Sequence, residues 1–91
     1  MPVQSRYATQ MNWWVYIIKS EKSGKYYVGY TESLERRLHE HNKGKNKSTR
    51  NKGPWVIAYT EEYKTKVEAR RRELIIKSYK GGNAFKKLVS G

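Results

Sequence analysis

The first patterned part of the chain consists of two apolar and aromatic runs of the kind typical of β-strands. Two runs rich in Trp, Tyr, Val and Ile, residues 13–19 and 25–30, flank the turn-forming stretch S-E-K-S-G. Gly24 in this stretch can adopt a positive φ, so the runs predict an antiparallel hairpin. Because side chains alternate across a strand, the first run should present two faces: Trp14, Tyr16 and Ile18 on one, and Trp13, Val15 and Ile17 on the other.

A short amphipathic helix is expected in L-E-R-R-L-H-E-H-N, residues 34–42. Leu34 and Leu38 lie one helical turn apart, so they would share a face. The hydroxyl of Thr31 or of Ser33 can accept a hydrogen bond from a free backbone N–H at the helix start. Either residue is therefore a candidate N-cap.

The segment after this helix is almost wholly polar and basic. N-K-G-K-N-K-S-T-R-N-K-G, residues 42–53, has no apolar period and predicts a mobile surface loop. Pro54 closes it, and the apolar run W-V-I-A-Y, residues 55–59, predicts a third strand. A basic loop between two ordered elements is well placed to contact a charged partner.

Two further helices are expected towards the C-terminus. T-K-V-E, residues 65–68, matches a capping box, so a longer helix should run from there to about Lys80. The Gly81-Gly82 pair should end it, since glycine readily takes the left-handed conformation found after helices. Asn83 can then cap a short final helix.

The predicted order of elements is β-β-α-β-α-α. It defines an α+β fold, in which a small three-stranded antiparallel sheet is flanked by helices. Residues 1–12 show no sustained period and predict an N-terminal tail, so residues 13–91 form one predicted domain. A chain of 91 residues is too short for two independent hydrophobic cores.

Charge is the strongest feature of the composition. Twenty Lys and Arg stand against eight Asp and Glu, a formal net charge of +12. Such an excess attracts polyanions, and nucleic acid is the leading partner because neutralised phosphates release counterions. A highly soluble basic protein with no specific target is the alternative. A membrane partner is not expected, since the basic residues are spread along the chain and no apolar run reaches about 18 residues.

The absence of cysteine excludes a disulfide framework, a zinc–thiolate site and a cysteine nucleophile. It is compatible with a reducing cytoplasm, where we expect the protein, associated with the nucleoid if the source is bacterial. With only two histidines, a His-rich metal site is excluded as well. Acid–base chemistry must therefore come from Tyr, His, Lys and a few carboxylates.

Several residues could carry such chemistry, and each also has a simpler role. Tyr16 and Tyr27 lie in the two strands of the hairpin, where tyrosines commonly serve only cross-strand packing. Arg37 and His41 are one helical turn apart, which also fits a solvated helix face. Glu73 could pair with Arg70 or Lys77, or its carboxylate could bind a hard cation such as Mg²⁺. Taken separately, these patterns leave both roles open.

Together these residues resemble a family pattern. The stretch from Trp13 to Val89 resembles a GIY-YIG nuclease domain, with W-V-Y (14–16) and Y-V-G (27–29) at the positions of the family's two name motifs. Y-T-E-S-L-E-R-R-L-H-E-H-N resembles its arginine-bearing helix, and E-A-R-R-R-E-L-I-I-K its metal-ligand helix. H-N-K-G-K and the G-P entry to the third strand are similar to the small stand-alone members. These are related to the nuclease domain of bacterial UvrC repair proteins.

The resemblance implies hydrolysis of DNA phosphodiester bonds with Mg²⁺ or Mn²⁺, in repair or recombination, with RNA as an alternative substrate. It implies these catalytic residues, with Glu73 as the metal ligand: Tyr16, Tyr27, Arg37, His41 and Glu73. Arg37 and the metal would lower the pKa of Tyr16 so that its hydroxyl can act on the attacking water. Gly29 would leave room for the backbone to turn into the arginine helix.

The nucleic-acid contacts are expected in the basic loop and near the domain end, where Asn83 matches an asparagine of several family members: Lys43, Lys45, Lys47, Arg50, Lys52 and Asn83. Such backbone contacts carry no base information, which favours binding directed by DNA structure. Two positions depart from the family: Trp14 and Val15 replace Gly and Ile, and Tyr30 stands where repair members have lysine.

Two functions from other classes stay open. One is a basic nucleic-acid-binding module that retains the fold without turnover. The other is a structural RNA-associated protein of the ribosome or its assembly. The partner proteins and the oligomeric state are not predicted by the sequence.

Overall fold

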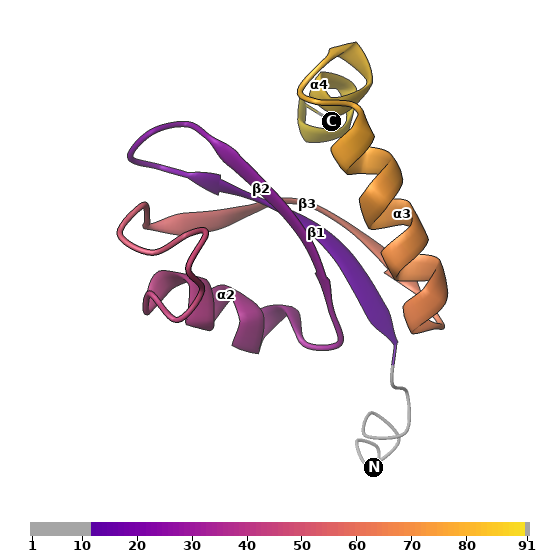
Figure 1. Ribbon diagram of the computed structural model, residues 1–91, viewed down its shortest axis with the longest axis horizontal. Coiled ribbons are helices and arrows are strands. Elements are labelled where there is room, and N and C mark those ends of the chain that lie inside the picture. The colour runs from indigo at the N-terminus through magenta and orange to yellow at the C-terminus, as the bar shows by residue number, and fades with distance from the viewer. Residues whose placement is uncertain (1–11, 91) are drawn as a thin grey trace.

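A three-stranded antiparallel sheet forms the centre of the domain (Figure 1). The computed structural model describes residues 12–90, so the predicted tail lies outside the described residues apart from Asn12. The elements are β1 (Trp13–Ser20), β2 (Tyr26–Thr31), α2 (Leu34–Asn42), β3 (Trp55–Tyr63), α3 (Lys66–Ser78) and α4 (Asn83–Ser90). Their order confirms the predicted α+β fold, and β1 lies between β2 and β3 in the sheet.

The predicted hairpin and the predicted caps of α2 and α3 are present. Strands β1 and β2 pair antiparallel, with Tyr16 opposite Gly29, and Gly24 takes a φ of 77° in the turn between them. Of the two candidate caps for α2, Ser33 caps the helix, through a bond from Arg36 N to its hydroxyl. Thr65 and Glu68 form the complete capping box of α3. Local sequence signals therefore set where these helices begin.

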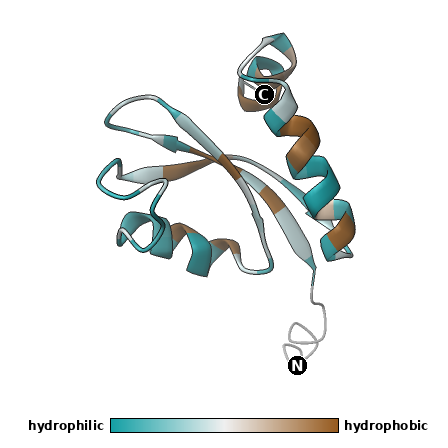
Figure 2. Ribbon diagram, viewed as in Figure 1, coloured by the Kyte–Doolittle hydropathy of each residue, from teal (hydrophilic) through white to brown (hydrophobic). Residues whose placement is uncertain are grey.

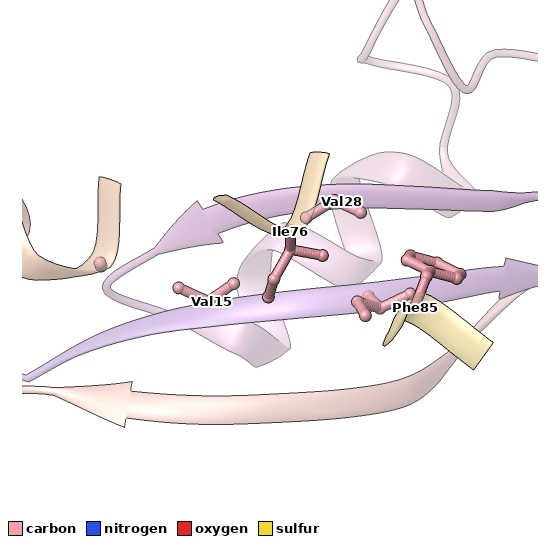
Figure 3. Close-up of a cluster of buried hydrophobic side chains, with 6 residues drawn as sticks. Val15, Val28, Ile76 and Phe85 are labelled. Atoms are coloured by element: carbon pink, nitrogen blue, oxygen red, sulfur yellow. The ribbon is translucent and has the colours of Figure 1, made fainter. Parts of the chain in front are cut away.

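The two faces of β1 pack against different helices, because α2 covers one side of the sheet and α3 the other (Figure 1). One face joins α3 and α4 in a core cluster, of which Figure 3 labels four members: Val15, Val28, Ile76 and Phe85. The other face carries Tyr16 and Ile18, which cluster with Trp55 and pack against Leu34 and Leu38 of α2. In Figure 2 brown, hydrophobic segments appear within the strands and as bands on α3, while α2 and the loop after it are mostly teal, the hydrophilic colour.

The structure differs from the predicted bounds by one residue at the end of β1 and at both ends of β2, and in three further places. Strand β3 continues four residues beyond Tyr59, because residues 60–63 pair with the first half of β1 although their sequence is polar. Helix α3 ends at Ser78, two residues before Lys80. Asn83 is the first residue of α4. The shifts at the two helix ends are of the size by which helix bounds commonly vary.

The basic loop is anchored to the domain. Its Thr49 is fully buried, the indole N–H of Trp55 donates to the Thr49 carbonyl at 3.2 Å, and the Ser20 hydroxyl donates to the Lys52 carbonyl at 2.6 Å. The expectation of a mobile loop is therefore wrong for this part of the segment, because its backbone carbonyls are held by buried donors. Within residues 12–90, no helix is long and apolar enough to cross a membrane.

Candidate active site

Tyr16 is buried at the centre of the sheet, with 2% of its surface exposed. Its ring extends across β2 at Gly29, the residue opposite it in the ladder. A Cβ at position 29 would lie 2.6 Å from Tyr16 Cζ, closer than such atoms come. Gly29 does not have a positive φ, so its role is to admit the Tyr16 ring. This replaces the expectation that Gly29 serves the turn into the next helix.

A chain of buried hydrogen bonds leads away from the Tyr16 hydroxyl. Tyr16 Oη lies 2.9 Å from His41 Nε2, and His41 Nδ1 lies 2.7 Å from Thr49 Oγ1. The Thr49 hydroxyl has the Asn46 carbonyl oxygen as an acceptor at 3.5 Å. When it donates there, Thr49 Oγ1 accepts from the His41 Nδ1–H, and His41 Nε2 is left to accept from Tyr16. His41 and Thr49 are 1% and 0% exposed, so water does not compete for these bonds.

Arg37 projects from α2 beside the Tyr16 hydroxyl. Its Nη1 donates to Glu40 Oε1 at 3.2 Å, while its Nε is buried and has no hydrogen-bond partner among the described residues. A buried donor without a partner costs about 1–3 kcal/mol. The arrangement therefore favours an anionic acceptor for this donor, and a phosphate oxygen has the required charge.

The surroundings shift the pKa values of Tyr16 and His41 in opposite directions. Burial and the neighbouring Tyr27 raise the pKa of Tyr16, and the Arg37 guanidinium offsets this only in part. Burial, and then the charge of Arg37, lower the pKa of His41, although Glu40 opposes the shift. We expected Arg37 and a bound metal to lower the pKa of Tyr16 below its ordinary value. For Arg37 without a metal this expectation is wrong, since the net shift is upward. His41 is the neutral base next to a protonated phenol.

Glu73 faces the sheet from α3, with 6% of its surface exposed, in the same buried stripe as Ala69 and Ile76. Its carboxylate also raises the pKa of Tyr16, so it lies within electrostatic reach of that hydroxyl. The sequence offered Arg70 and Lys77 as ion-pair partners of Glu73. Lys77 is the partner, because its Nζ lies 2.9 Å from Glu73 Oε2.

The residues fit a Mg²⁺ ion held by one carboxylate. Among residues 12–90, no group of three His, Cys, Asp or Glu side chains could form a complete metal cage. Mg²⁺ needs no such cage, since it commonly binds one or two protein carboxylates and takes its remaining ligands from water and phosphate. Glu73 supplies one buried carboxylate, and a cation there would compete with the half-exposed Lys77 ammonium.

Tyr27 lies next to this cluster. Its ring centroid is 4.9 Å from that of His41 and 6.5 Å from that of Tyr16, and its side chain is half-buried. Strand β2, which carries Tyr27, is an edge strand of the sheet. The structure therefore gathers Tyr16, Tyr27, Arg37 and His41, with Glu73 within electrostatic reach of Tyr16.

The residues expected to contact nucleic acid lie outside this cluster. All are exposed: Lys43, Lys45, Lys47, Arg50, Lys52 and Asn83. Lys43 lines a cavity of about 600 Å³ together with His41, so the start of the basic loop adjoins the cluster. Asn83 makes no hydrogen bond or ion pair with the cluster within residues 12–90, and its assignment stays a prediction.

Sequence reasoning missed one buried polar partner. Thr49 belongs to the site because it holds His41, yet it lies in a loop whose residues have no periodic pattern. The only signal was the apolar Trp55 shortly after it, whose indole needs an acceptor when buried and finds it in the Thr49 carbonyl.

Comparison with known proteins assigns the class. Residues 12–86 match the model of the GIY-YIG catalytic domain, and the chain therefore belongs to the GIY-YIG family of nucleases. Its relatives include small UPF0213 proteins. One from Halobacterium salinarum is 45% identical over 64 residues, which is 69% of this chain and 82% of that protein. One from Staphylococcus haemolyticus is 43% identical over 67 residues, 72% of this chain and 80% of that protein.

A solved structure also supports the assignment. The solution NMR structure of a UPF0213 protein from Bacillus halodurans is similar to this domain, with a TM-score of 0.55 and 37% sequence identity. The match covers 88% of this chain and 84% of that one. The small stand-alone members of the family are thus the group to which this chain is similar in both sequence and fold.

Proposed function

We propose that this chain is an endonuclease that hydrolyses DNA phosphodiester bonds with Mg²⁺ or Mn²⁺, and that it acts on DNA structure or backbone in repair or recombination. The buried, unpaired Arg37 Nε beside the Tyr16 hydroxyl carries the proposal, since it favours an anion next to a chain of proton-transfer groups. A phosphodiester is such an anion, and the family and the net charge of +12 both favour nucleic acid as its source.

Arg37 would bind and orient the scissile phosphate. Its Nε, which lacks a partner, donates to one non-bridging oxygen, while Glu40 continues to hold Nη1 and fixes the guanidinium plane. Hydrogen bonds from a fixed cation stabilise the negative charge that grows on the phosphate in the transition state. Arg37 is therefore a binding residue that also lowers the barrier.

Tyr16 and His41 would move the proton of the attacking water. Tyr16 Oη accepts this proton while its own proton passes to His41 Nε2, 2.9 Å away. The water oxygen forms a bond to phosphorus, the bond from phosphorus to the 3′ oxygen breaks, and the leaving oxygen takes a proton from solvent. This route avoids a free tyrosinate, which the raised pKa of Tyr16 disfavours.

Glu73 would hold the divalent cation. When bound there, Mg²⁺ or Mn²⁺ supplies a Lewis acid that offsets charge on the phosphate and on the leaving oxygen. The buried position of Glu73 keeps its carboxylate in a fixed orientation, since neighbours in the α3 stripe pack around it.

A cleavage panel tests the proposal. The purified chain is incubated with plasmid, single-stranded, flapped and four-way DNA and with RNA, each with Mg²⁺, with Mn²⁺ or with EDTA. We expect metal-dependent cleavage of DNA that is lost in Glu73→Gln and strongly reduced in Tyr16→Phe. Glu62→Gln, which alters an exposed carboxylate on β3, is the matched control and should cleave normally.

The outcomes separate the candidate functions. Cleavage that persists in Glu73→Gln contradicts the metal assignment, and unchanged turnover in Tyr16→Phe returns Tyr16 to a packing role. Salt-dependent binding without cleavage of any substrate would instead identify a non-catalytic nucleic-acid-binding module.

A further inference from the structure

Two aromatic residues that flank the two name motifs of the family form a pair at one end of the sheet. Trp13 begins β1 and Tyr30 is the last residue but one of β2, and their ring centroids are 6.1 Å apart at an interplanar angle of 43°. Both side chains are half-buried, with part of each packed against the core shared with α3. The pair therefore has a rigid base and an accessible side.

Two cations from α3 lie on these rings. Lys66 Nζ is 5.7 Å from the Trp13 ring centroid, and Arg70 Cζ is 5.9 Å from that of Tyr30. Arg70 also donates a hydrogen bond to the Tyr30 hydroxyl at 3.4 Å. We call this surface the aromatic platform and define it by Trp13, Tyr30, Lys66 and Arg70. Aromatic faces next to Lys and Arg are the combination that binds single-stranded nucleic acid.

A cavity connects the platform to Arg37. It has a volume of about 360 Å³, and its lining includes Trp13, Tyr30 and Lys66 from the platform and Arg36 and Arg37 from α2. The same Arg37 carries the buried Nε that has no partner within the described residues. The platform thus adjoins the proposed position of the scissile phosphate.

Two carboxylates also line this cavity, but they do not cancel its cations. Glu40 is already paired with Arg36 at 3.9 Å and with Arg37 at 3.2 Å, and Glu32 is exposed. Tyr30 and Lys66 also line a second cavity, of about 490 Å³, whose other lining residues include two cations and no acidic residue: Val67, Arg70, Arg71 and Leu74. The charge around the platform is therefore positive in both cavities.

We propose that the aromatic platform binds an unpaired nucleotide of DNA, adjacent to the phosphate held by Arg37, by stacking its base on Trp13 and Tyr30. The position of that phosphate rests on the proposed function. Stacking tolerates any base, because every base has a π-face, and Lys66 and Arg70 would shift from the rings to the flanking phosphates. The platform gives this chain a preference for DNA with an unpaired strand beside the cleavage point.

The experiment measures binding without cleavage. The wild-type chain in EDTA is titrated with fluorescein-labelled flapped DNA and with a blunt duplex of the same length, and binding is followed by anisotropy. Tyr30→Leu and Trp13→Leu keep apolar bulk against the core and remove the aromatic face. We expect each to weaken binding to flapped DNA by about tenfold, with little change for the duplex.

The control and a second readout keep the result clear. Tyr59→Leu removes a half-buried aromatic from the same core cluster on β3, and its binding to flapped DNA should match the wild type. 2-Aminopurine is also placed at each unpaired position next to the junction, and its fluorescence should be quenched at one position by the wild type and not by Tyr30→Leu. This measurement works even where Trp13→Leu fails to fold.

The two proposals fail in different ways. If both platform variants bind flapped DNA as tightly as the wild type, or if no 2-aminopurine position is quenched, the platform proposal is wrong, whatever the cleavage panel shows. If platform-dependent binding is found but no substrate is cleaved, the platform stands and the nuclease proposal fails.

Discussion

The ring and the hydroxyl of Tyr16 have different surroundings. The ring belongs to a buried cluster with Ile18 and Trp55, as expected of a tyrosine that serves packing. The hydroxyl reaches across Gly29 to His41 and Arg37, where no packing role needs it. Packing and chemistry are therefore not alternatives for this residue, because packing fixes the position of the hydroxyl.

Thr49 gives a test of the proton route at the scale of one residue. Thr49→Val is nearly isosteric and removes only the hydroxyl that accepts from His41 Nδ1–H. Without this acceptor, the imidazole loses its orientation and its fixed tautomer. We expect cleavage to slow by about tenfold while DNA affinity stays unchanged, which single-turnover rates and anisotropy measure separately. Ser48→Ala, an exposed neighbour in the same loop, is the control.

The pH dependence of cleavage reports on the same residue. His41 faces Tyr16 and Tyr27 from the sheet and Arg37 and Glu40 from its own helix. Its pKa is lowered, so it stays neutral somewhat below the ordinary histidine value of about 6.5, and the rate should fall only as the pH drops through this lowered pKa. In Thr49→Val the pKa of His41 should change, and the acid limb of the pH–rate profile should shift with it. An unchanged limb would show that His41 is not the proton acceptor.

The sequence could predict only part of this site, for a physical reason. His41 is one turn from Arg37, so helical geometry alone placed the two side chains on one face. Thr49 and the role of Gly29 depend on how the chain crosses itself in three dimensions. The contact of Thr49 with His41 requires the path of an aperiodic loop, and the space at Gly29 is needed only because Tyr16 lies opposite it.

At the scale of elements, the three consecutive arginines of α3 have three different environments. Arg70 lies on the Tyr30 ring, Arg71 is exposed, and Arg72 binds both carboxylate oxygens of Glu61, at 2.8 and 3.1 Å. The division follows from the 100° that separates successive residues on a helix. A run that appears uniformly basic in the sequence thus provides one surface cation, one platform cation and one structural ion pair.

Two carboxylates bind cations of α3: the buried Glu73 and the half-buried Glu61. They should differ in how much they contribute to the stability of the fold. The i,i+4 ion pair of Glu73 with the half-exposed Lys77 adds only about 0.3–0.5 kcal/mol, whereas burying the charge of Glu73 costs several. Stability therefore does not explain a glutamate in the apolar stripe of α3. Glu61 differs, because it accepts hydrogen bonds from Arg72, Tyr59 and Tyr63 and joins β3 to α3.

We therefore expect opposite effects of two matched substitutions. Glu73→Gln should leave the free energy of unfolding unchanged or raise it by up to about 1 kcal/mol, while it abolishes cleavage. Glu61→Gln should lower it by about 1–3 kcal/mol, because Arg72 loses its charged partner, while cleavage at low temperature persists. Urea denaturation measures both. A large loss of stability in Glu73→Gln would make its ion pair structural.

The Glu61 contribution should also depend on pH. Burial raises the pKa of Glu61, but the hydrogen bonds from Arg72, Tyr59 and Tyr63 lower it more. A carboxyl whose folded-state pKa is lowered stabilises the protein fully above its unfolded pKa of about 4.5, and this stabilisation is lost as the pH falls through the folded value. The stability difference between wild type and Glu61→Gln should accordingly shrink below about pH 4.5.

The elements themselves were largely predictable, and the main exception again involves distant pairing. Caps, turn residues and runs of β-forming residues are local signals, so the hairpin and the starts of α2 and α3 follow from the sequence. The second half of β3, T-E-E-Y, has no apolar alternation and forms a strand because Trp13–Tyr16 of β1 offers it backbone partners. Edge strands often carry such polar sequences, because one of their sides faces water.

At the scale of the whole molecule, the net charge of +12 is distributed over surfaces with different roles. The aromatic platform and Arg37 line one cavity, while the loop cations follow α2, and the start of that loop shares another cavity with His41. DNA held at both places would cross the proposed active site. The anchored loop should therefore contribute to affinity more than an equal charge elsewhere.

Salt dependence tests this distribution. The triple variant Lys45→Gln, Lys47→Gln, Arg50→Gln removes three exposed loop cations, and the control Lys64→Gln, Lys86→Gln, Lys87→Gln removes three exposed cations from elsewhere. Each neutralised duplex phosphate contributes about 0.9 to the slope of log K against log salt concentration, so the loop variant should lose up to about 2.7 of that slope.

The control variant distinguishes DNA binding at the loop from attraction of DNA by the total charge of the protein. Both variants have the same net charge, so a DNA partner that senses only total charge would lose the same slope with each. A loss confined to the loop variant requires phosphates bound at the loop itself. Because these side chains are exposed, neither variant should change the unfolding midpoint, and a difference in slope then reports binding alone.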